Sequence, residues 1–208
     1  MNAWLSFLDV LAPPTCLACA SLMLRSISVL CDPCASQIPK AARMVGHPSA
    51  VSACWSMGPY SGLLGSLVRN AKYKRSLLAA DHLGHVLGEG LVGKVKVDAV
   101  VPVPTTFPRR LYRGFDQADR LAQGVSSCLS LEYRPILSRR GVSRQVGKDA
   151  TGRRNLRPEA FSVRPMECPE SILLVDDVKT TGATLNAAAR QLKRHGVARI
   201  YAAVVAHC

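Results

Sequence analysis

Two adjacent carboxylates and a run of hydroxyl-bearing residues lie between an apolar segment and a helix-like one. The acids are Asp176 and Asp177, and the run that follows them holds Thr180, Thr181, Gly182, Ala183 and Thr184. The start of a helix offers unpaired N–H groups and the positive end of its dipole, which suits a phosphate. Paired carboxylates can accept hydrogen bonds from two neighbouring hydroxyls. The pattern therefore predicts a site for a ribose 5-phosphate, with the acids on the diol and the loop on the phosphate.

Two other interpretations of this stretch stay open from the residues alone. Asp177 could cap the helix while Thr180 and Thr181 form a turn. An aspartate pair also serves magnesium-dependent phosphoryl transfer.

Four of the eight cysteines form two CxxC pairs near the amino terminus. They are Cys16, Cys19, Cys31 and Cys34. Four thiolates at this spacing predict one tetrahedral zinc ion, and its closed shell predicts a structural role. A pair of redox dithiols or unligated thiols is the alternative, and contact of this ribbon with nucleic acid or a partner is a further hypothesis. Because a disulfide framework would spread its cysteines along a short secreted chain, the clustering favours a reducing cytoplasm.

The elements that must position these groups alternate between strand and helix patterns. Strands are expected at 51–57, 97–103, 171–175 and 199–206, and helices at 63–73, 77–91, 116–128 and 182–195. Buried apolar strands alternating with helices predict a parallel sheet covered on both faces. A short amino-terminal helix ending at Pro13–Pro14 and a linker over 39–48 are also expected. We therefore predict two units, residues 1–45 with the helix and ribbon, and residues 46–208.

Composition narrows the class of protein. The 208 residues are 48% hydrophobic and 20% charged, which is typical of a globular chain. No apolar run approaches the ~18 residues of a membrane span, and Arg25 is the first basic residue, so a secretory signal is not expected. The net charge of +13 suits pyrophosphate and nucleic acid alike. Aromatic residues make up only 5%, which weakens a model based on base stacking.

Several motifs along the chain resemble those of one family. The sequence is similar to the type I phosphoribosyltransferases, which use 5-phosphoribosyl-1-pyrophosphate (PRPP), and within them to the ComF family of competence proteins. The motifs are Pro13-Pro14-x-Cys16-x-x-Cys19, Gly58-Pro-Tyr-Ser-Gly62, Ala71-Lys-Tyr73, Val101-Pro-Val-Pro104, Arg110-Leu-Tyr-Arg-Gly-Phe-Asp-Gln117, Arg144-Gln145, Arg153-Arg-Asn155 and Asp176-Asp-Val-Lys-Thr-Thr-Gly-Ala-Thr184.

This resemblance implies an α/β fold: a type I phosphoribosyltransferase-like parallel sheet flanked by helices, with a small N-terminal zinc ribbon. It implies that Asp176 and Asp177 hold the ribose hydroxyls, partly through magnesium, and that 180–184 cradles the 5-phosphate. It also implies that the loop from Thr105 grips pyrophosphate and that Lys72 faces the site.

The segment Arg139–Asn155 matches a flap that closes over the site in relatives. Arg144 is its catalytic candidate, because cations there would stabilise charge developing on pyrophosphate. A solvated basic loop is the alternative for this segment.

The implied function is a phosphoribosyltransferase of nucleoside metabolism, with Mg²⁺ and PRPP, structural Zn²⁺ and an unknown acceptor. The alternative is a non-catalytic PRPP- or nucleotide-binding protein that handles single-stranded DNA during natural competence.

Three positions depart from the family pattern. Asp116 stands where Asn is usual, Lys179 adds a cation, and Thr180 occupies the place of a carboxylate base in purine-salvage relatives. Threonine cannot act as that base at neutral pH, so ordinary purine transfer is not expected.

Overall fold

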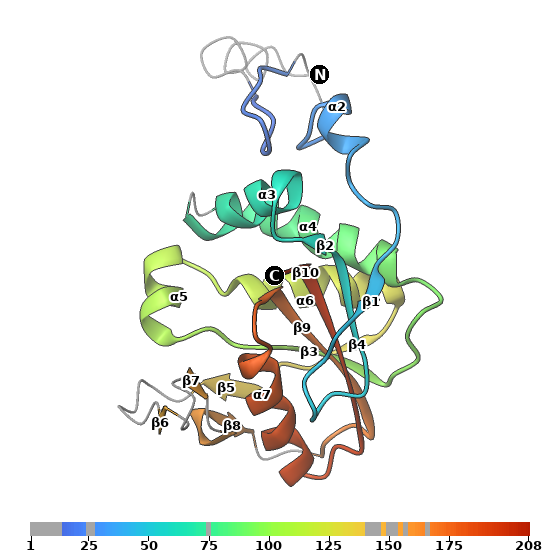
Figure 1. Cartoon of the computed structure of the whole chain (residues 1–208), viewed down its shortest axis with the longest axis vertical. Helices are drawn as coiled ribbons and strands as arrows, with labels where there is room; N and C mark the ends of the chain where they lie inside the picture. Colours follow the sequence, from blue (N-terminus) through green and yellow to red (C-terminus); the bar gives the residue numbers. More distant parts are fainter. Residues whose placement is uncertain are drawn as a thin grey trace, which may run out of the picture.

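The structure is a computed structural model (Figure 1). It describes residues 14–23, 28–73, 76–139, 147–148, 154–155, 158–164 and 167–208. The expected amino-terminal helix and Arg144 lie outside these residues.

A six-stranded sheet forms the centre of the larger domain. Its order is β1-β2-β10-β9-β3-β4. The strands are β1 (Arg43–Val45), β2 (Cys54–Pro59), β3 (Ala99–Pro102), β4 (Glu132–Tyr133), β9 (Ser171–Lys179) and β10 (Arg199–His207). All neighbouring pairs are parallel except β1 with β2. The predicted parallel sheet is therefore confirmed, and the stretch 39–48, expected to be a linker, contributes an antiparallel edge strand.

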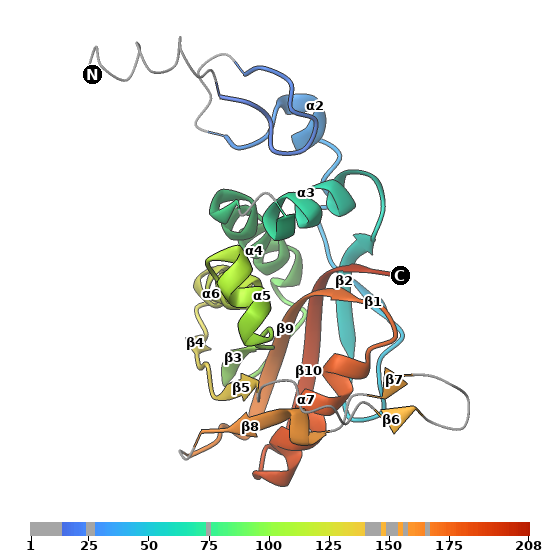
Figure 2. The ribbon, with the colours of Figure 1, turned by 90° about the vertical axis from the view of Figure 1, so that its left-hand side faces the viewer.

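Alternate side chains of the strands feed two separate cores. Leu173 and Val175 of β9 pack with helices α3 (Gly62–Tyr73), α4 (Leu77–Leu91) and α6 (Gln117–Leu129) on one face. Ile172 and Leu174 pack with α7 (Ala183–Arg194) on the other. Figure 2 shows α7 on the opposite side of the sheet from these helices. Because both faces are covered, the strands are continuously apolar, as the sequence pattern predicted.

Strand β9 runs beyond the apolar segment that predicted it. The expected strand stopped at Val175, but Asp176 pairs with Val204 and Lys179 with His207 of β10. The backbone ladder thus continues through polar residues, and both aspartates lie within the strand, at its carboxyl end.

Helices α4 and α6 cross at very close range. A Cβ atom on Gly124 would lie 2.7 Å from the backbone of Gly84, so only glycine permits this approach. The crossing fixes α6, whose first turn borders a cavity at the carboxyl edge of the sheet.

Shorter elements complete the described chain. They are α2 (Asp32–Ala35), α5 (Phe107–Arg113), the 3-10 helix η1 (Pro158–Ala160), and the two-stranded pairs β5 (Leu137–Arg139) with β8 (Phe161–Val163) and β6 (Gly147–Lys148) with β7 (Arg154–Asn155). Helix α5, which the sequence patterns did not predict, has no buried residue and projects from the domain (Figure 1).

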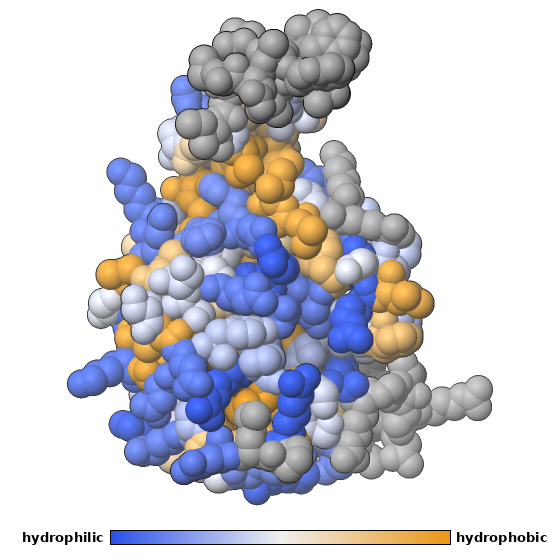
Figure 3. All heavy atoms as spheres, turned by 180° about the vertical axis from the view of Figure 1, so that it is seen from behind, coloured by the Kyte–Doolittle hydropathy of each residue, from blue (hydrophilic) through white to orange (hydrophobic). Residues whose placement is uncertain are grey.

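The surface agrees with the composition. Figure 3 shows hydrophilic side chains over most of the face opposite to that of Figure 1, with apolar ones gathered toward the cysteine-containing end. None of the helices in the described part of the chain is long and apolar enough to cross a membrane.

Candidate functional site

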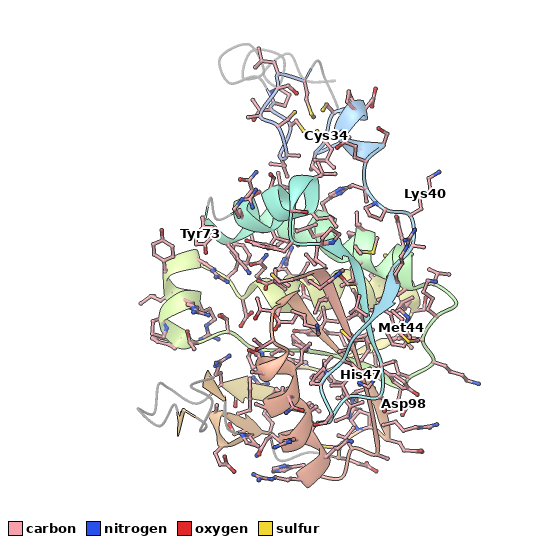
Figure 4. All side chains as sticks on the ribbon, in the orientation of Figure 1. Cys34, Lys40, Met44, His47, Tyr73 and Asp98 are labelled. Atoms are coloured by element: carbon pink, nitrogen blue, oxygen red, sulfur yellow. The ribbon has the colours of Figure 1, made fainter. Side chains whose placement is uncertain are left out.

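The four clustered cysteines converge on one point. The Sγ atoms of Cys16, Cys19, Cys31 and Cys34 all lie within 4.8 Å of one another, and those of Cys19 and Cys31 are 3.7 Å apart. Thiolates at about 2.3 Å from a tetrahedral ion are separated by about 3.8 Å, so the set fits a metal such as zinc. Figure 4 shows Cys34 among the sulfur atoms at this end of the molecule.

The backbone around the first pair favours a thiolate. Burial by itself would raise the pKa of Cys16, but hydrogen bonds from the N–H groups of Cys19, Cys31 and Ala18 outweigh it and lower the pKa to about 6. The Ala18 N–H lies 3.4 Å from the Cys16 sulfur. A thiolate is the form that binds a metal ion.

This cysteine ribbon (residues 14–23 and 28–38) is seated on α3. The Asn70 side-chain amide donates to the carbonyl of Leu17, and the buried side chains of Met23 and Leu30 belong to the same core as α3 and α4. The ribbon therefore contacts the helix whose last turn carries Lys72.

A cavity of about 280 Å³ opens at the carboxyl edge of the sheet. Its acids are Asp116, Asp176 and Asp177, its cations are Lys72, Arg109, Arg113 and Arg139, and its hydroxyls include Thr105, Thr180 and Thr184. Tyr60 and Gln117 also line the cavity wall. Open α/β sheets bind ligands at this edge, because the strand ends and helix starts converge there.

The two strand-end aspartates have different surroundings. Lys72 Nζ lies 2.9 Å from Asp177 Oδ1, and the two side chains are only 16% and 14% exposed. Asp176 instead accepts a hydrogen bond from the backbone N–H of Asp177 at 2.8 Å. Burial, then the neighbouring Asp177 carboxylate, raise the pKa of Asp176 to about 8. Asp177 is thus ion-paired with Lys72, whereas burial and the neighbouring carboxylate favour the protonated form of Asp176.

The loop before α7 is shaped by Gly182. Its φ of 77° lies in the left-handed region that favours glycine, and it occupies the N-cap position without a side-chain cap. The Ala183 N–H donates to Thr181 Oγ1 at 3.3 Å, so Thr181 stabilises the turn. Thr180 and Thr184 line the cavity, whereas Thr181, Gly182 and Ala183 are not among its lining residues. Asp177 does not cap α7, because it lies in β9.

Asp116 connects the loop after β3 to the start of α6. Its Oδ2 accepts from the Thr105 N–H at 2.9 Å, and its Oδ1 accepts from the Ala118 N–H at 3.2 Å. An asparagine offers one oxygen where the carboxylate offers two, which gives this departure from the family pattern a structural reason. Burial raises the pKa of Asp116.

Three arginines face the acids from two different elements. Arg109 and Arg113 come from α5, and Arg139 ends β5. The Arg139 guanidinium lies 5.1 Å from the centre of the Phe161 ring. Burial lowers the pKa of Arg139, while Asp176 and Asp116 oppose that shift. Within the expected flap, the structure describes only Arg139 and the backbone of β6 and β7.

Sequence reasoning missed several residues of this cavity that could contact a ligand. Arg109, Arg113, Tyr60 and Gln117 all line it, and no role had been assigned to them. The last three belong to motifs that resembled the family, which was the available signal.

The fold and pocket define a phosphoribosyltransferase-like α/β protein, and residues 111–207 match the phosphoribosyl transferase domain family. The chain is 30% identical over 185 residues to "Competence protein F" of Haemophilus influenzae, covering 82% of this chain and 81% of that protein. It is 27% identical over 189 residues to "DNA utilization protein YhgH" of Escherichia coli, covering 85% and 83% of the two chains. "Competence protein ComFC" of Streptococcus pneumoniae is 30% identical over 103 residues, covering 50% and 45%. The chain belongs to the ComF family of phosphoribosyltransferase-like proteins.

Proposed function

We propose that this protein binds PRPP at the carboxyl edge of the sheet and transfers its phosphoribosyl group to an acceptor. The bond from C1 of the ribose to pyrophosphate breaks, pyrophosphate leaves with the electron pair, and the acceptor's lone pair forms the new bond to C1. One observation carries the proposal: a single cavity brings together three acids, four cations and the threonines of a helix-start loop.

Each part of the cavity matches one part of the ligand. Asp176 and Asp177 would accept hydrogen bonds from the ribose hydroxyls. Thr180 and Thr184, beside the start of α7, would hold the 5-phosphate. The loop at Thr105 would contact pyrophosphate.

Cations supply the remaining interactions. Arg109, Arg113 and Arg139 would stabilise the charge that develops on pyrophosphate. Mg²⁺ is a hard cation that prefers oxygen ligands, so the aspartates and pyrophosphate would hold it. It would stabilise the negative charge on the departing pyrophosphate. Arg144 stays a prediction, since it lies outside the described residues. We further propose that the ribbon holds a structural zinc ion and that the protein works in the reducing cytoplasm, in nucleoside metabolism.

The decisive experiment measures transfer and binding together. Isotope-labelled PRPP is incubated with Mg²⁺ and candidate acceptors, beside calorimetry of PRPP alone. Arg109→Ala should weaken PRPP binding, whereas Arg110→Ala, one residue along α5 and outside this cavity, should not. Equal binding by both variants would contradict the assignment of the cavity, and binding without transfer would favour the second candidate.

That second candidate is a non-catalytic protein that binds PRPP or a nucleotide and handles single-stranded DNA. The names of the relatives refer to competence and DNA utilization. Helix α5 also supports it, because Phe107, Leu111 and Tyr112 are 60%, 73% and 57% exposed beside Arg110. Exposed aromatic rings and arginines are the groups that bind single-stranded nucleic acid.

Salt dependence tests this candidate. If binding of a labelled single-stranded oligonucleotide depends on phosphate contacts, log affinity should fall linearly with log salt. The double variant Phe107→Ala/Arg110→Ala should weaken DNA binding and leave PRPP binding intact. No binding at low salt, or a flat salt response, would exclude this DNA-handling role.

A further inference from the structure

Gln117 is buried in the cavity wall with its amide unpaired. It is the first residue of α6, it is 1% exposed, and it lines the cavity. Neither its Nε2 nor its Oε1 has a hydrogen-bond partner among the described residues. A buried donor and acceptor left unpaired are costly, so such a group needs an explanation.

The backbone that carries Gln117 is held on both sides. Asp116 accepts from the Ala118 N–H, and α6 is fixed against α4 at the glycine crossing. A small shift of the helix therefore does not bring the amide to a partner outside the cavity. Its partner must come into the cavity.

The amide selects among the chemical groups of the ligand. It presents one acceptor and two donors, so its best partner both donates and accepts a hydrogen bond. Phosphate and pyrophosphate oxygens at neutral pH chiefly accept, which would leave Oε1 unpaired. The cavity already has cations for those oxygens, namely Arg109, Arg113 and Arg139. A sugar hydroxyl satisfies both atoms of the amide.

We propose that Gln117 hydrogen-bonds a hydroxyl of the ligand's sugar and so makes the pocket specific for a hydroxylated sugar phosphate. This inference rests on the proposed function, because it takes PRPP as the ligand. Gln117 acts beside Asp176 and Asp177: the Asp177 carboxylate, paired with Lys72, accepts hydrogen bonds from hydroxyls, whereas the amide both donates and accepts.

The test uses three probes and two variants. Binding of PRPP, ribose 5-phosphate and inorganic pyrophosphate is measured by calorimetry for the wild type and for Gln117→Met, which keeps the length of the side chain without its polar atoms. The control is Gln191→Met on α7, because Gln191 also has an unpartnered Oε1 but does not line the cavity. The melting temperature of each ligand-free protein is recorded in parallel.

Gln117→Met should weaken the binding of PRPP and of ribose 5-phosphate by a similar factor, roughly tenfold. The affinity for pyrophosphate should stay unchanged. Its ligand-free melting temperature should stay level or rise, because an unpaired polar group has been removed. Gln191→Met should leave all three affinities unchanged.

Unchanged affinities for both sugar phosphates in Gln117→Met would overturn the inference and leave PRPP binding standing. A loss shared by PRPP and pyrophosphate but absent for ribose 5-phosphate would overturn it too, since the contact would then be with pyrophosphate. A wild type that binds none of the probes would defeat the proposed function itself, and the inference with it.

Discussion

The cysteine ribbon and the sheet domain are held together by different means. The ribbon gathers four thiols within 4.8 Å, and its described buried apolar side chains, among them Met23 and Leu30, belong to the core that it shares with α3 and α4. The domain packs two apolar cores against the faces of one sheet. A small unit buries little apolar surface by itself, and four thiols placed to hold a metal ion can stabilise it instead. The ribbon's thiols would serve to hold its fold, whereas the acids and cations of the domain line a cavity that is open to a ligand.

The largest expected effect is that of removing the zinc ion proposed for the ribbon. Structural zinc contributes roughly 10–16 kcal/mol of apparent binding in small zinc modules, so chelation or Cys16→Ser should unfold the ribbon. The main thermal transition of the domain should persist. Zinc content by metal analysis and alkylation of the thiols measure the change, with the exposed Cys208→Ser as control. Purified protein with clearly less than one zinc and four freely alkylated ribbon thiols would refute this contrast.

The next effect belongs to the domain and depends on pH. The pKa of Asp176 is about 8 in the folded state against 3.8 as the ordinary value. Between these values the folded chain holds a proton that the unfolded chain releases, so stability falls as pH rises from about 4 to about 8. Asp176→Asn keeps an oxygen that accepts from the Asp177 N–H, but it cannot ionise, so it removes this pH-dependent loss of stability. Relative to the wild type, its free energy of unfolding should therefore rise over that range by an amount on the order of a few kcal/mol. The melting temperature at each pH measures this change.

Asp98 provides a control of opposite sign. Hydrogen bonds from the Ser171 side chain and backbone lower the pKa of Asp98, so its contribution is present above its ordinary pKa and lost in acid. Relative to the wild type, Asp98→Asn should lose stability as pH rises up to the ordinary pKa of 3.8, and the difference should stay level above it. Parallel pH profiles for the two variants would show that Asp176 lacks a raised pKa.

The smallest effect concerns the contact between the two regions. Asn70→Ala removes the hydrogen bond to Leu17 and should destabilise the docked ribbon by about 0.5–1.5 kcal/mol. Because Lys72 follows two residues later and pairs with Asp177, PRPP affinity should fall a few-fold at most. Hydrogen exchange of the ribbon measures the first change and calorimetry the second. Exchange as slow as in the exposed neighbour variant Arg69→Ala would show that the contact does not matter.

The sequence predicted those features that are local along the chain. The run Ile172–Val175 predicted a buried strand, and the CxxC spacing predicted the thiol cluster. The extension of β9 was missed because its polar residues are held by pairing with β10 rather than by burial. Edge strand β1 was missed because three residues carry little periodicity.

The candidate site was predictable only where one motif carried it. Asp176 and Thr184 lie eight positions apart, so their spacing predicted a common pocket. Gln117 and Arg139 reach the same pocket from distant positions through the crossing of α4 with α6 and through β5. The burial of the Gln117 amide is a property of that packing, and the residue type alone does not predict it.

Magnesium-dependent PRPP binding is the most direct test of the pocket. Calorimetry with and without Mg²⁺ is run on the wild type, Asp177→Asn and Thr181→Ala, with Arg110→Ala as control and melting temperatures recorded for each. Asp177→Asn loses a charge-assisted acceptor and should bind about ten- to a hundredfold more weakly, while Thr181→Ala, which loses only the bond to the Ala183 N–H, should lose roughly two- to tenfold. We expect this order of affinities, with every variant still folded. A wild type with no magnesium-dependent binding, or both variants binding as tightly as the wild type, would contradict it.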